Sequence, residues 1–436
     1  MNNPINIFWF RRDLRLEDNH GLYEALKEEL NVLPIFIFDI DILSKLPKND
    51  ARVSFIYDTL DKLNLSLGKN NNSGIAMYHG KPKDIIKQLL DTHNVRTVYT
   101  NHDYEPYART RDSEIAAYLE TRDVTFKTYK DQVIFEKNDI VKKDGKPYLV
   151  YTPYMKKWKE RFRQTHLQRF PSEDYLHKIG SIERLPQISL SDMEFTTPNQ
   201  IIKPYSVSSS LIKSYEATRN YPAKDSTSRL GPHLRFGTIS IRSIVDKAIA
   251  ETNEIFWQEL IWREFFMQIL WHFPQTLTKS FKSQYDRILW RNNEAEFKAW
   301  CAGKTGYPLV DAGMRQLNKT GFMHNRVRML VGSFLCKHLL IDWRWGEAYF
   351  AEKLHDYEMA SNIGNWQWVA GCGVDAAPYF RIFNPTTQIQ KFDKNLEYIQ
   401  SWVPDFQELT YPTLIVDHKF ARERCLSVYK EALNPE

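Results

Sequence analysis

The chain has 436 residues, of which 42% are hydrophobic and 26% are charged, a balance typical of a globular protein with room for two or three domains. No run of about 18 apolar residues occurs, which argues against a membrane-spanning helix. The net charge is only +5, but residues 131–436 contain 41 Lys and Arg against 35 Asp and Glu, so an anionic partner is expected to bind there.

The N-terminal third alternates short apolar strands with helical patterns. Strands are expected at 5–10, 32–38, 74–79, 96–101 and 124–129, and helices at 19–30, 51–67, 83–93 and 106–121. This alternation favours a doubly wound parallel sheet, and no GxGxxG follows a strand, so an NAD-type site is not supported. Arg11, Arg12 and Arg15 follow the first strand, where such sheets bind ligands; a surface ion-pair cluster is the alternative.

The rest of the chain divides into a connector and a helical region. Residues 136–210 contain scattered Pro, Gly and Ser around one expected helix at 149–162, whereas the pattern is helical from about residue 211 onward. We therefore expect an α/β domain (1–130), an interdomain linker (131–210) and an all-α domain (211–436).

The four cysteines are widely spaced and form no CxxC pair, and the N-terminus lacks the order of a signal peptide. These features predict reduced thiols in a cytoplasmic protein, in the cytoplasm or nucleoid of a bacterium, and no metal site.

A glutamate lies within an aromatic helix at 253–273. Because buried charges are rarely tolerated alone, Glu259 needs a partner or a ligand; a pair with Arg263, four residues later, is the alternative. Thr227, Ser228 and Arg229 precede a helical stretch at 230–236 and could hold a diphosphate.

Two arginines of the next segment point to different sides. Arg326 and Arg328 are two residues apart on a helix and cannot share a face, so we expect one to meet solvent or a polyanion and Arg328 to pair with Asp356. The nearby GKTG (303–306) lacks the spacing of a phosphate loop and is not interpreted as one.

The stretch 343–383 is rich in tryptophan and contains Trp343, Trp345, Trp366 and Trp368. One interpretation is an aromatic helical core, and the other is a pocket that stacks a large planar group and passes electrons through aromatic rings.

Six motifs follow one another along the chain: WFRRDLRLEDN (9–19), TSRLGPHLRFG (227–237), ELIWREF (259–265), GKTGYPLVDAGMRQL (303–317), HNRVRM (324–329) and NWQWVAGCGVDAAPYFRIFNP (365–385). In this order, over residues 5–405, the chain resembles the photolyase/cryptochrome family. The resemblance implies an N-terminal α/β antenna domain, a long linker, and a helical catalytic domain that holds FAD.

Within the family the chain is most similar to microbial cyclobutane pyrimidine dimer photolyases of the class I type. Asn325 and Met329 stand where (6-4) photolyases have histidines, and Met329 also differs from the Gln of the DASH group. Asn362 stands where plant cryptochromes have an Asp; a neutral carboxamide can hydrogen-bond a reduced flavin without supplying a ready proton.

The resemblance also implies the site residues. The catalytic set is Glu259, Trp262, Asn325, Met329 and Trp368 around the lesion and Asn362 at the flavin; the electron path is Trp290, Trp343 and Trp366; the DNA contacts are Arg219, Arg326, Arg381 and Gln388. The FAD set is Tyr215, Thr227, Ser228, Arg229, Leu230, Gly231 (a Ser in many relatives), Arg328, Asp356, Tyr357, Glu358 (usually Asp) and Asn362.

The implied activity is light-driven splitting of pyrimidine dimers in UV-damaged DNA by electron transfer from photoexcited reduced FAD, in a monomer. Tyr107 and Ala108 replace the Asn-Glu pair of folate-binding members, which argues against a folate antenna; a deazaflavin, a second flavin or an empty site remain open. The alternatives are a blue-light photoreceptor of the cryptochrome type and an NAD(P)H-dependent flavoprotein, and the latter lacks a nicotinamide fingerprint.

Overall fold

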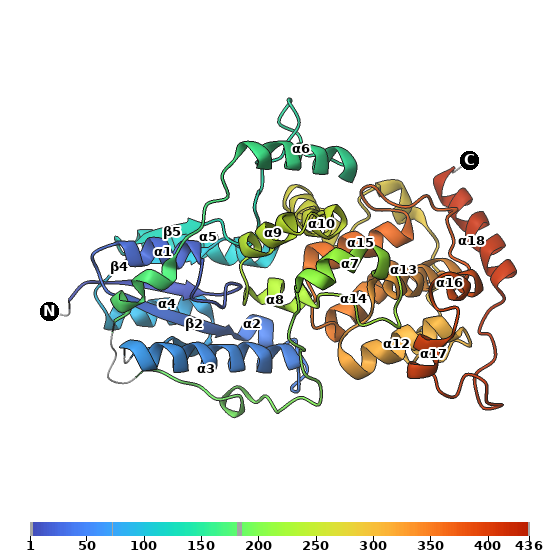
Figure 1. Cartoon of the computed structure of the whole chain (residues 1–436), viewed down its shortest axis with the longest axis horizontal. Helices are drawn as coiled ribbons and strands as arrows, with labels where there is room; N and C mark the ends of the chain where they lie inside the picture. The colour runs from blue at the N-terminus through green and yellow to red at the C-terminus, as the bar shows by residue number, and fades with distance from the viewer. Residues whose placement is uncertain (1–2, 72, 181–184, 435–436) are drawn as a thin grey trace. The chain divides into compact units, whose positions relative to one another are not determined.

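A computed structural model describes residues 3–71, 73–180 and 185–434 of the chain (Figure 1). The chain packs into two compact units, each made of three segments. Unit 1 contains Met1–Asp139, Trp158–Tyr205 and Arg229–Ala250, and unit 2 contains Ile140–Lys157, Ser206–Ser228 and Glu251–Glu436. The expected linker at 131–210 is therefore divided between both units, and its residues 181–184 lie outside the described residues.

The described part of unit 1 is built on a five-stranded parallel sheet in the order β3-β2-β1-β4-β5. The strands are β1 (Ile5–Phe10), β2 (Val32–Asp39), β3 (Ala76–Gly80), β4 (Val95–Asn101) and β5 (Thr125–Tyr129). All strand pairs are parallel, with Phe8 opposite Pro34 on β2 and opposite Tyr99 on β4. The predicted doubly wound sheet is confirmed.

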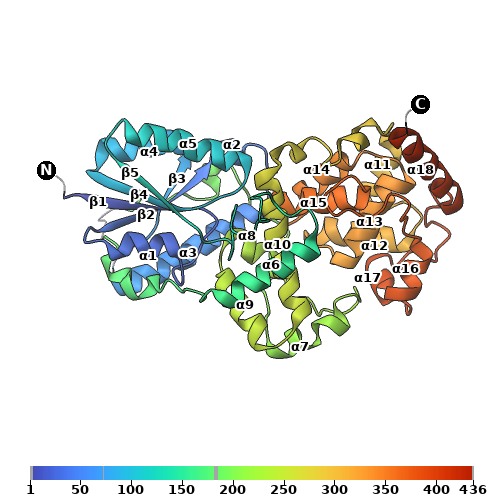
Figure 2. The same ribbon diagram turned by 90° about the horizontal axis from the view of Figure 1, so that it is seen from above.

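Side-chain alternation along the strands decides which helices cover each face. Phe8 and Phe10 pack in one core cluster with α1 and α3, whereas Ile7 and Trp9 pack in another with α4 and α5. Figure 2 shows the sheet between these two helix layers. Their bounds are α1 (His20–Lys27), α3 (Ala51–Asn71), α4 (Pro82–Thr92) and α5 (Pro106–Glu120).

The helices begin where the sequence supplies suitable caps. The side chain of Asn19 accepts a hydrogen bond from Leu22 N at the start of α1, and α4 and α5 each begin with a proline, whose missing N–H costs nothing at that position. Unit 1 also contains α2 (Ile40–Leu43), the 3₁₀ helices Ser172–Lys178 and Ser191–Met193, α8 (Leu230–Phe236) and α9 (Ile241–Ala250).

In its described residues unit 2 is helical, as predicted. Its longest helix, α10 (Glu254–His272), is buried on most sides and begins at Asn253, whose side chain accepts from Phe256 N. The other helices are α7 (Ser209–Thr218), α11 (Glu294–Cys301), α12 (Pro308–Thr320), α13 (Asn325–Ser333), α14 (Trp343–Lys353), α15 (Met359–Ala370), α16 (Pro385–Phe392), α17 (Glu397–Trp402) and α18 (His418–Leu433), with 3₁₀ helices at Pro274–Leu277 and Ser283–Arg287. The boundary between the units falls within α6 (Tyr151–Gln164).

One helix of unit 2 ends in an irregular turn. A π-helical turn, η5 (Phe334–His338), follows α13 directly, and its side chains are buried. Such turns insert an extra residue and change the direction of the side chains that follow, and they are frequent at functional sites. Among the described residues, no helix has both the length and the apolar character that crossing a membrane requires.

Candidate functional site

Glu259 on α10 forms an ion pair with Arg219, the residue that caps the C-terminal end of α7. Glu259 Oε1 lies 2.5 Å from Arg219 Nη1, and the side chains of Glu259 and Arg219 are 33% and 20% exposed. Although burial opposes the charge, the Glu259 carboxylate raises the pKa of Arg219. Glu259 therefore has a partner, Arg219, which the family resemblance assigns to the DNA contacts. A predicted lesion residue and a predicted DNA-contacting residue thus meet here.

Tyr215, one turn before Arg219, shares this environment. Burial, with the Glu259 carboxylate as a second cause, raises the pKa of Tyr215 to about 12. The Arg219 guanidinium lies 5.2 Å from the centroid of the Tyr215 ring. The phenol therefore stays protonated and can serve as a hydrogen-bond donor for an anionic ligand.

Trp262, one turn after Glu259 on α10, has a stacking partner that the sequence did not reveal. The ring of Tyr151 stacks on it at a centroid distance of 3.5 Å and an interplanar angle of 8°. Tyr151 is fixed by its hydroxyl, which donates to Gln258 O at 2.8 Å, and by its backbone N–H, which donates to Asp375 Oδ2 at 3.0 Å. One face of Trp262 is therefore occupied by the protein. No sequence signal distinguished Tyr151 from the other aromatic residues of 149–162.

Asn325 and Met329 lie on one face of α13, four residues apart. Asn325 is exposed and Met329 is half-buried. Between them, Arg326 donates to Asn220 Oδ1 at 2.5 Å and to Met329 Sδ at 3.5 Å, and its guanidinium lies 4.5 Å from the Phe392 ring.

Arg326 is influenced by the charges of the other two arginines predicted to contact phosphates, Arg219 and Arg381. Burial lowers the pKa of Arg326, and the nearby charges of Arg219 and Arg381 lower it further. Arg381 is exposed, with its guanidinium 6.0 Å from the Trp368 ring, and it has no ion pair among the described residues. Arg326 is thus near enough to both Arg219 and Arg381 to be repelled by each. Gln388, half-buried on α16, completes the predicted DNA set.

The predicted pair of Arg328 and Asp356 is confirmed. Arg328 Nη2 lies 2.8 Å from Asp356 Oδ2, and Arg328 Nε donates to Met323 O at 2.7 Å. The second carboxylate oxygen, Asp356 Oδ1, is buried and accepts no hydrogen bond from the described residues. A buried unpaired oxygen is costly, so it points to a ligand with a hydrogen-bond donor.

Asn362 on α15 is held by Glu347, which no sequence motif indicated. Its Nδ2 donates to Glu347 Oε1 at 3.0 Å and to Glu347 O at 3.2 Å, and the Tyr357 hydroxyl donates to Glu347 Oε1 at 3.4 Å. Burial raises the pKa of Glu347. Because the amide N–H group is engaged, the side-chain oxygen of Asn362 is left as the acceptor for a ligand.

Glu358, next to this network, caps α15. Its carboxylate accepts a hydrogen bond from Ser361 N at 2.9 Å, and the side chain is buried. The predicted diphosphate contacts lie in two units: Thr227 and Ser228 end a segment of unit 2, whereas Arg229, Leu230 and Gly231 begin a segment of unit 1. Arg229 has a φ of +53° directly before α8.

The three tryptophans of the predicted electron path belong to the core of unit 2. Trp366 and Trp343 are 3% and 1% exposed, and Trp290 is half-buried beside Tyr429 at a ring distance of 6.0 Å. A methyl group on Gly346 would lie 2.2 Å from Trp366 Cη2, so only glycine allows this close approach.

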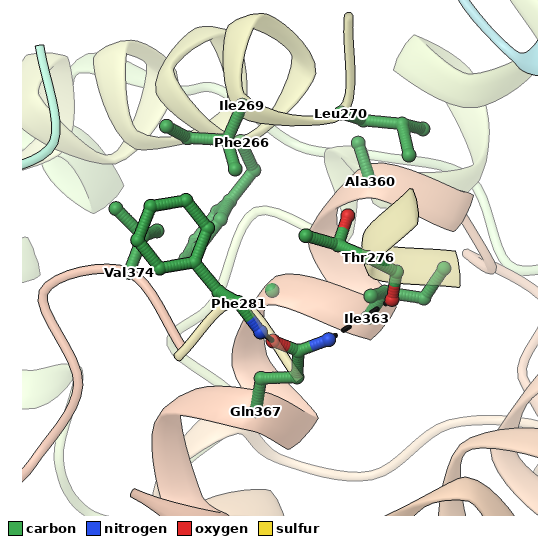
Figure 3. Close-up of a pocket in the computed structure, with 10 residues that line it drawn as sticks. Phe266, Ile269, Leu270, Thr276, Phe281, Ala360, Ile363, Gln367 and Val374 are labelled. Atoms are coloured by element: carbon green, nitrogen blue, oxygen red, sulfur yellow. Dashed lines mark hydrogen bonds between the residues drawn. The ribbon is translucent and has the colours of Figure 1, made fainter. Parts of the chain in front are cut away.

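Figure 3 shows a small apolar pocket between α10 and α15. Gln367 closes its wall, donating to Thr276 O and Lys279 O and accepting from Phe281 N. None of the predicted site residues lines this pocket, so it is separate from the predicted lesion and flavin residues. Its lining is Phe266, Ile269, Leu270, Thr276, Phe281, Ala360, Ile363, Gly364, Gln367 and Val374.

The arginines that follow β1 in unit 1 are neutralised by carboxylates. Arg11 pairs with Asp112 at 2.6 Å, Arg12 with Asp103 and Glu105 at 3.2 Å each, and Arg15 with Asp131 at 2.7 Å. Their side chains are at most 9% exposed. The ion-pair interpretation of this motif therefore holds, but the cluster is buried rather than at the surface.

Tyr107, which occupies the position of the folate-binding pair, belongs to the same edge of the sheet. Its hydroxyl donates to Asp39 Oδ2 at 2.6 Å, and Arg111 lies 5.7 Å from its ring and 4.8 Å from that of Trp9.

Comparisons with known proteins agree with this geometry. Residues 6–173 match the family model described as DNA photolyase, and residues 256–410 match that described as the FAD binding domain of DNA photolyase. The chain is 36% identical to the deoxyribodipyrimidine photo-lyase of Agrobacterium fabrum, with 97% of each chain covered.

Two solved structures are similar over nearly their whole length. A bacterial class III photolyase from Agrobacterium tumefaciens has a TM-score of 0.88 and 34% identity, with 99% of this chain and 98% of that chain covered. An archaeal photolyase from Sulfolobus tokodaii with two FAD molecules has a TM-score of 0.78 and 33% identity, with 98% and 99% covered.

Proposed function

The chain belongs to the DNA photolyase family, light-driven DNA repair enzymes with FAD as cofactor, and we propose that it splits cyclobutane pyrimidine dimers in UV-damaged DNA. The observation that carries the proposal is the group of guanidiniums of Arg219, Arg326 and Arg381 beside Glu259 and Met329. Arg326 with arginines on two sides, and Glu259 as the carboxylate partner of one of them, suits a phosphate backbone better than a neutral small molecule.

Around the lesion, the protein would supply apolar faces and two hydrogen-bonding groups. Tyr151 stacks on one face of Trp262 and holds the indole ring in place, and Trp368 provides a second aromatic surface. Glu259 and Asn325 would hydrogen-bond the pyrimidine edges. Extrusion of a damaged base pair costs a few kcal/mol, less than for an intact pair, which favours the damaged site.

On the cofactor side, the residues present fit a flavin. Asp356 Oδ1 is a buried acceptor without a partner, and Arg328 places a cation beside it. When bound, reduced FAD supplies the photoexcitable electron donor. Arg328 would stabilise negative charge on the ring, and Asn362 would accept a hydrogen bond while its own N–H group stays on Glu347. Trp366, Trp343 and Trp290 would form an electron path through the core of unit 2.

The remaining assignments belong to the same proposal. We propose an antenna domain at 1–130, a linker at 131–210 and a catalytic domain at 211–436, in a monomer that acts in the cytoplasm. A second chromophore other than folate is proposed for the antenna domain; the two FAD molecules of the Sulfolobus tokodaii photolyase make a second flavin the first candidate to test.

The test is repair under light. The purified protein with reduced flavin is mixed with an oligonucleotide that contains one thymine dimer, and dimer content is followed under blue light and in the dark. Light-dependent loss of dimers, with (6-4) products unchanged, is the expected result. Bound and reduced flavin without repair would contradict the proposal and favour a photoreceptor.

The lesion pocket is tested by Glu259→Ala. This variant should retain FAD and lose at least about tenfold in repair, because the carboxylate is proposed to bond to the lesion and is not among the residues proposed for FAD. Repair at the wild-type rate would remove Glu259 from the site.

A further inference from the structure

Lys337 is a buried cation that the proposed reaction does not use. It lies in the π-helical turn η5 and is 1% exposed. Its Nζ donates one hydrogen bond, to Arg381 O at 2.8 Å, and the described residues give it no ion pair. A lysine almost never occupies such a position without a carboxylate partner.

The surroundings of Lys337 offer its charge little compensation. Burial lowers the pKa of Lys337 to about 8. The nearby thiols of Cys336, Cys372 and Cys425 are themselves buried, and their pKa values are raised, so they are neutral near pH 7. Methionine, an apolar residue of similar length, would fill the same space without a desolvation cost. Packing stability therefore does not explain a lysine here.

The hydrogen bond of Lys337 ends at the backbone of a loop that carries a predicted DNA contact. Residues 371–384 connect α15 to α16 without regular secondary structure. Within this loop, Arg381 N donates to Pro378 O at 2.9 Å, and the Arg381 guanidinium lies 5.4 Å from the Phe383 ring and 6.0 Å from the Trp368 ring. The buried Lys337 thus holds the backbone of Arg381, whose side chain is exposed.

The π-helical turn explains how a lysine at this position reaches the loop. An extra residue in a helical turn shifts the side chains that follow it out of α-helical register. In η5, all five side chains from Phe334 to His338 are buried, so the turn directs the cation into the core beneath the loop rather than to solvent.

We propose that Lys337 is a positioning residue for DNA binding, which holds the backbone of Arg381 so that its guanidinium meets a phosphate of the damaged strand. This inference rests on the proposed function of Arg381. A charge-assisted hydrogen bond from a buried donor gives the loop one conformation before DNA arrives, and a preformed contact loses less conformational entropy on binding.

The experiment compares Lys337→Met, Arg381→Ala and the double variant with wild-type holoprotein. Lys298→Met is the matched control, because it removes the same charge from a side chain that is 80% exposed on α11. Affinity for a dimer-containing oligonucleotide is measured in the dark at one salt concentration, together with repair kinetics, the flavin absorption spectrum and urea unfolding.

Lys337→Met should weaken DNA binding about tenfold, with KM raised and kcat unchanged, while its resistance to urea stays equal to or exceeds that of the wild type. The flavin spectrum should not change. The double variant should bind no more weakly than Arg381→Ala, because both changes remove one contact. Lys337→Gln, which keeps a shorter N–H donor, should bind with an affinity between those of wild type and Lys337→Met.

Wild-type affinity of Lys337→Met beside a weakened Arg381→Ala would overturn the role of Lys337 alone. Fully additive losses in the double variant would overturn it as well. Wild-type affinity of Arg381→Ala would overturn the assignment of Arg381 as a DNA contact, and the role of Lys337 with it.

Discussion

Two arginine clusters of the molecule have opposite electrostatic designs. In unit 1, the side chains of Arg11, Arg12 and Arg15 are at most 9% exposed, and each has a carboxylate within 3.2 Å. In unit 2, Arg326 bonds to a neutral amide and a thioether, and Arg381 has no ion pair among the described residues. The first cluster is neutralised within its own unit, whereas the second leaves positive charge available for a polyanion.

The difference shows that pairing, rather than the number of arginines, indicates a binding surface. Arg11, Arg12 and Arg15, like Arg326 and Arg381, lie in motifs that resemble the family, and the sequence alone does not show which of them have carboxylate partners. In unit 2, burial and then the like charges of Arg219 and Arg381 lower the pKa of Arg326, and no carboxylate of the described residues offsets them at that residue. An anion that binds beside Arg326 would offset this repulsion, which favours binding of a polyanion there.

The largest expected effect lies in the neutralised cluster. Asp131 accepts from both Arg15 and Arg242 at 2.7–2.8 Å and is 1% exposed. Although burial opposes its charge, Arg15 and Arg242 hold the pKa of Asp131 well below its usual range. Asp131→Asn leaves two buried guanidiniums underpaired and should reduce the free energy of unfolding by about 3–5 kcal/mol in urea titrations at pH 7.

The pH dependence of this effect has a defined sign. The pKa of Asp131 is lower in the folded protein than in the unfolded chain. The Asp131 carboxylate therefore stabilises the folded state above about pH 4, and this contribution is lost as the pH falls toward the folded-state pKa. Asp91→Asn, at a surface pair with Arg122, is the control and should cost less than about 1 kcal/mol. Equal losses in the two variants would break the comparison.

A cation without a carboxylate extends the comparison. Burial lowers the folded pKa of Lys337 to about 8, so the unfolded chain binds more protons than the folded one between pH 8 and the unfolded value near 10.4. Lys337→Met should therefore be more stable than wild type at pH 7 by up to about 3 kcal/mol, less the lost hydrogen bond. This advantage should shrink as the pH rises from 8 to 10; a constant difference would contradict the buried charge.

Replacing Arg326, which has no carboxylate partner among the described residues, should weaken DNA binding while the protein remains folded. Arg326→Met is expected to weaken binding to any DNA about tenfold and to lower the slope of affinity against salt by about one. Its free energy of unfolding should change by no more than about 1 kcal/mol, since the half-buried guanidinium also bonds to Asn220. Arg287→Met, an exposed arginine of the same unit, is the control, and a similar loss of affinity there would indicate a general charge effect.

The smallest expected effect comes from Glu259, the carboxylate that pairs with Arg219 in unit 2. Glu259→Gln frees Arg219 from its ion pair and should raise affinity for undamaged DNA about threefold, because one more cation can meet a phosphate. Affinity for dimer-containing DNA should not rise equally, since Glu259 is proposed to contact the lesion. Competition between the two DNAs measures the ratio, and an unchanged ratio would exclude the lesion contact.

The sequence by itself determined the fold and most element positions. Period-two and helical patterns are local properties, and the elements lie within a few residues of their expected bounds, as α8 at 230–236 and α10 at 254–272 illustrate. Helical spacing also sufficed for the pair of Arg328 and Asp356, because Arg326 and Arg328 cannot share a face and the inner arginine needs a partner.

Only the tertiary structure decided which charges are neutralised and which side chains act through others. Glu259 meets Arg219 from forty residues earlier, Tyr151 stacks on Trp262 across more than one hundred, and Lys337 reaches the backbone of Arg381. Such contacts depend on how distant segments pack, and a linear pattern carries no record of that packing. The sequence therefore names the chemical groups, and the packing of the chain sets their partners, burial and charge.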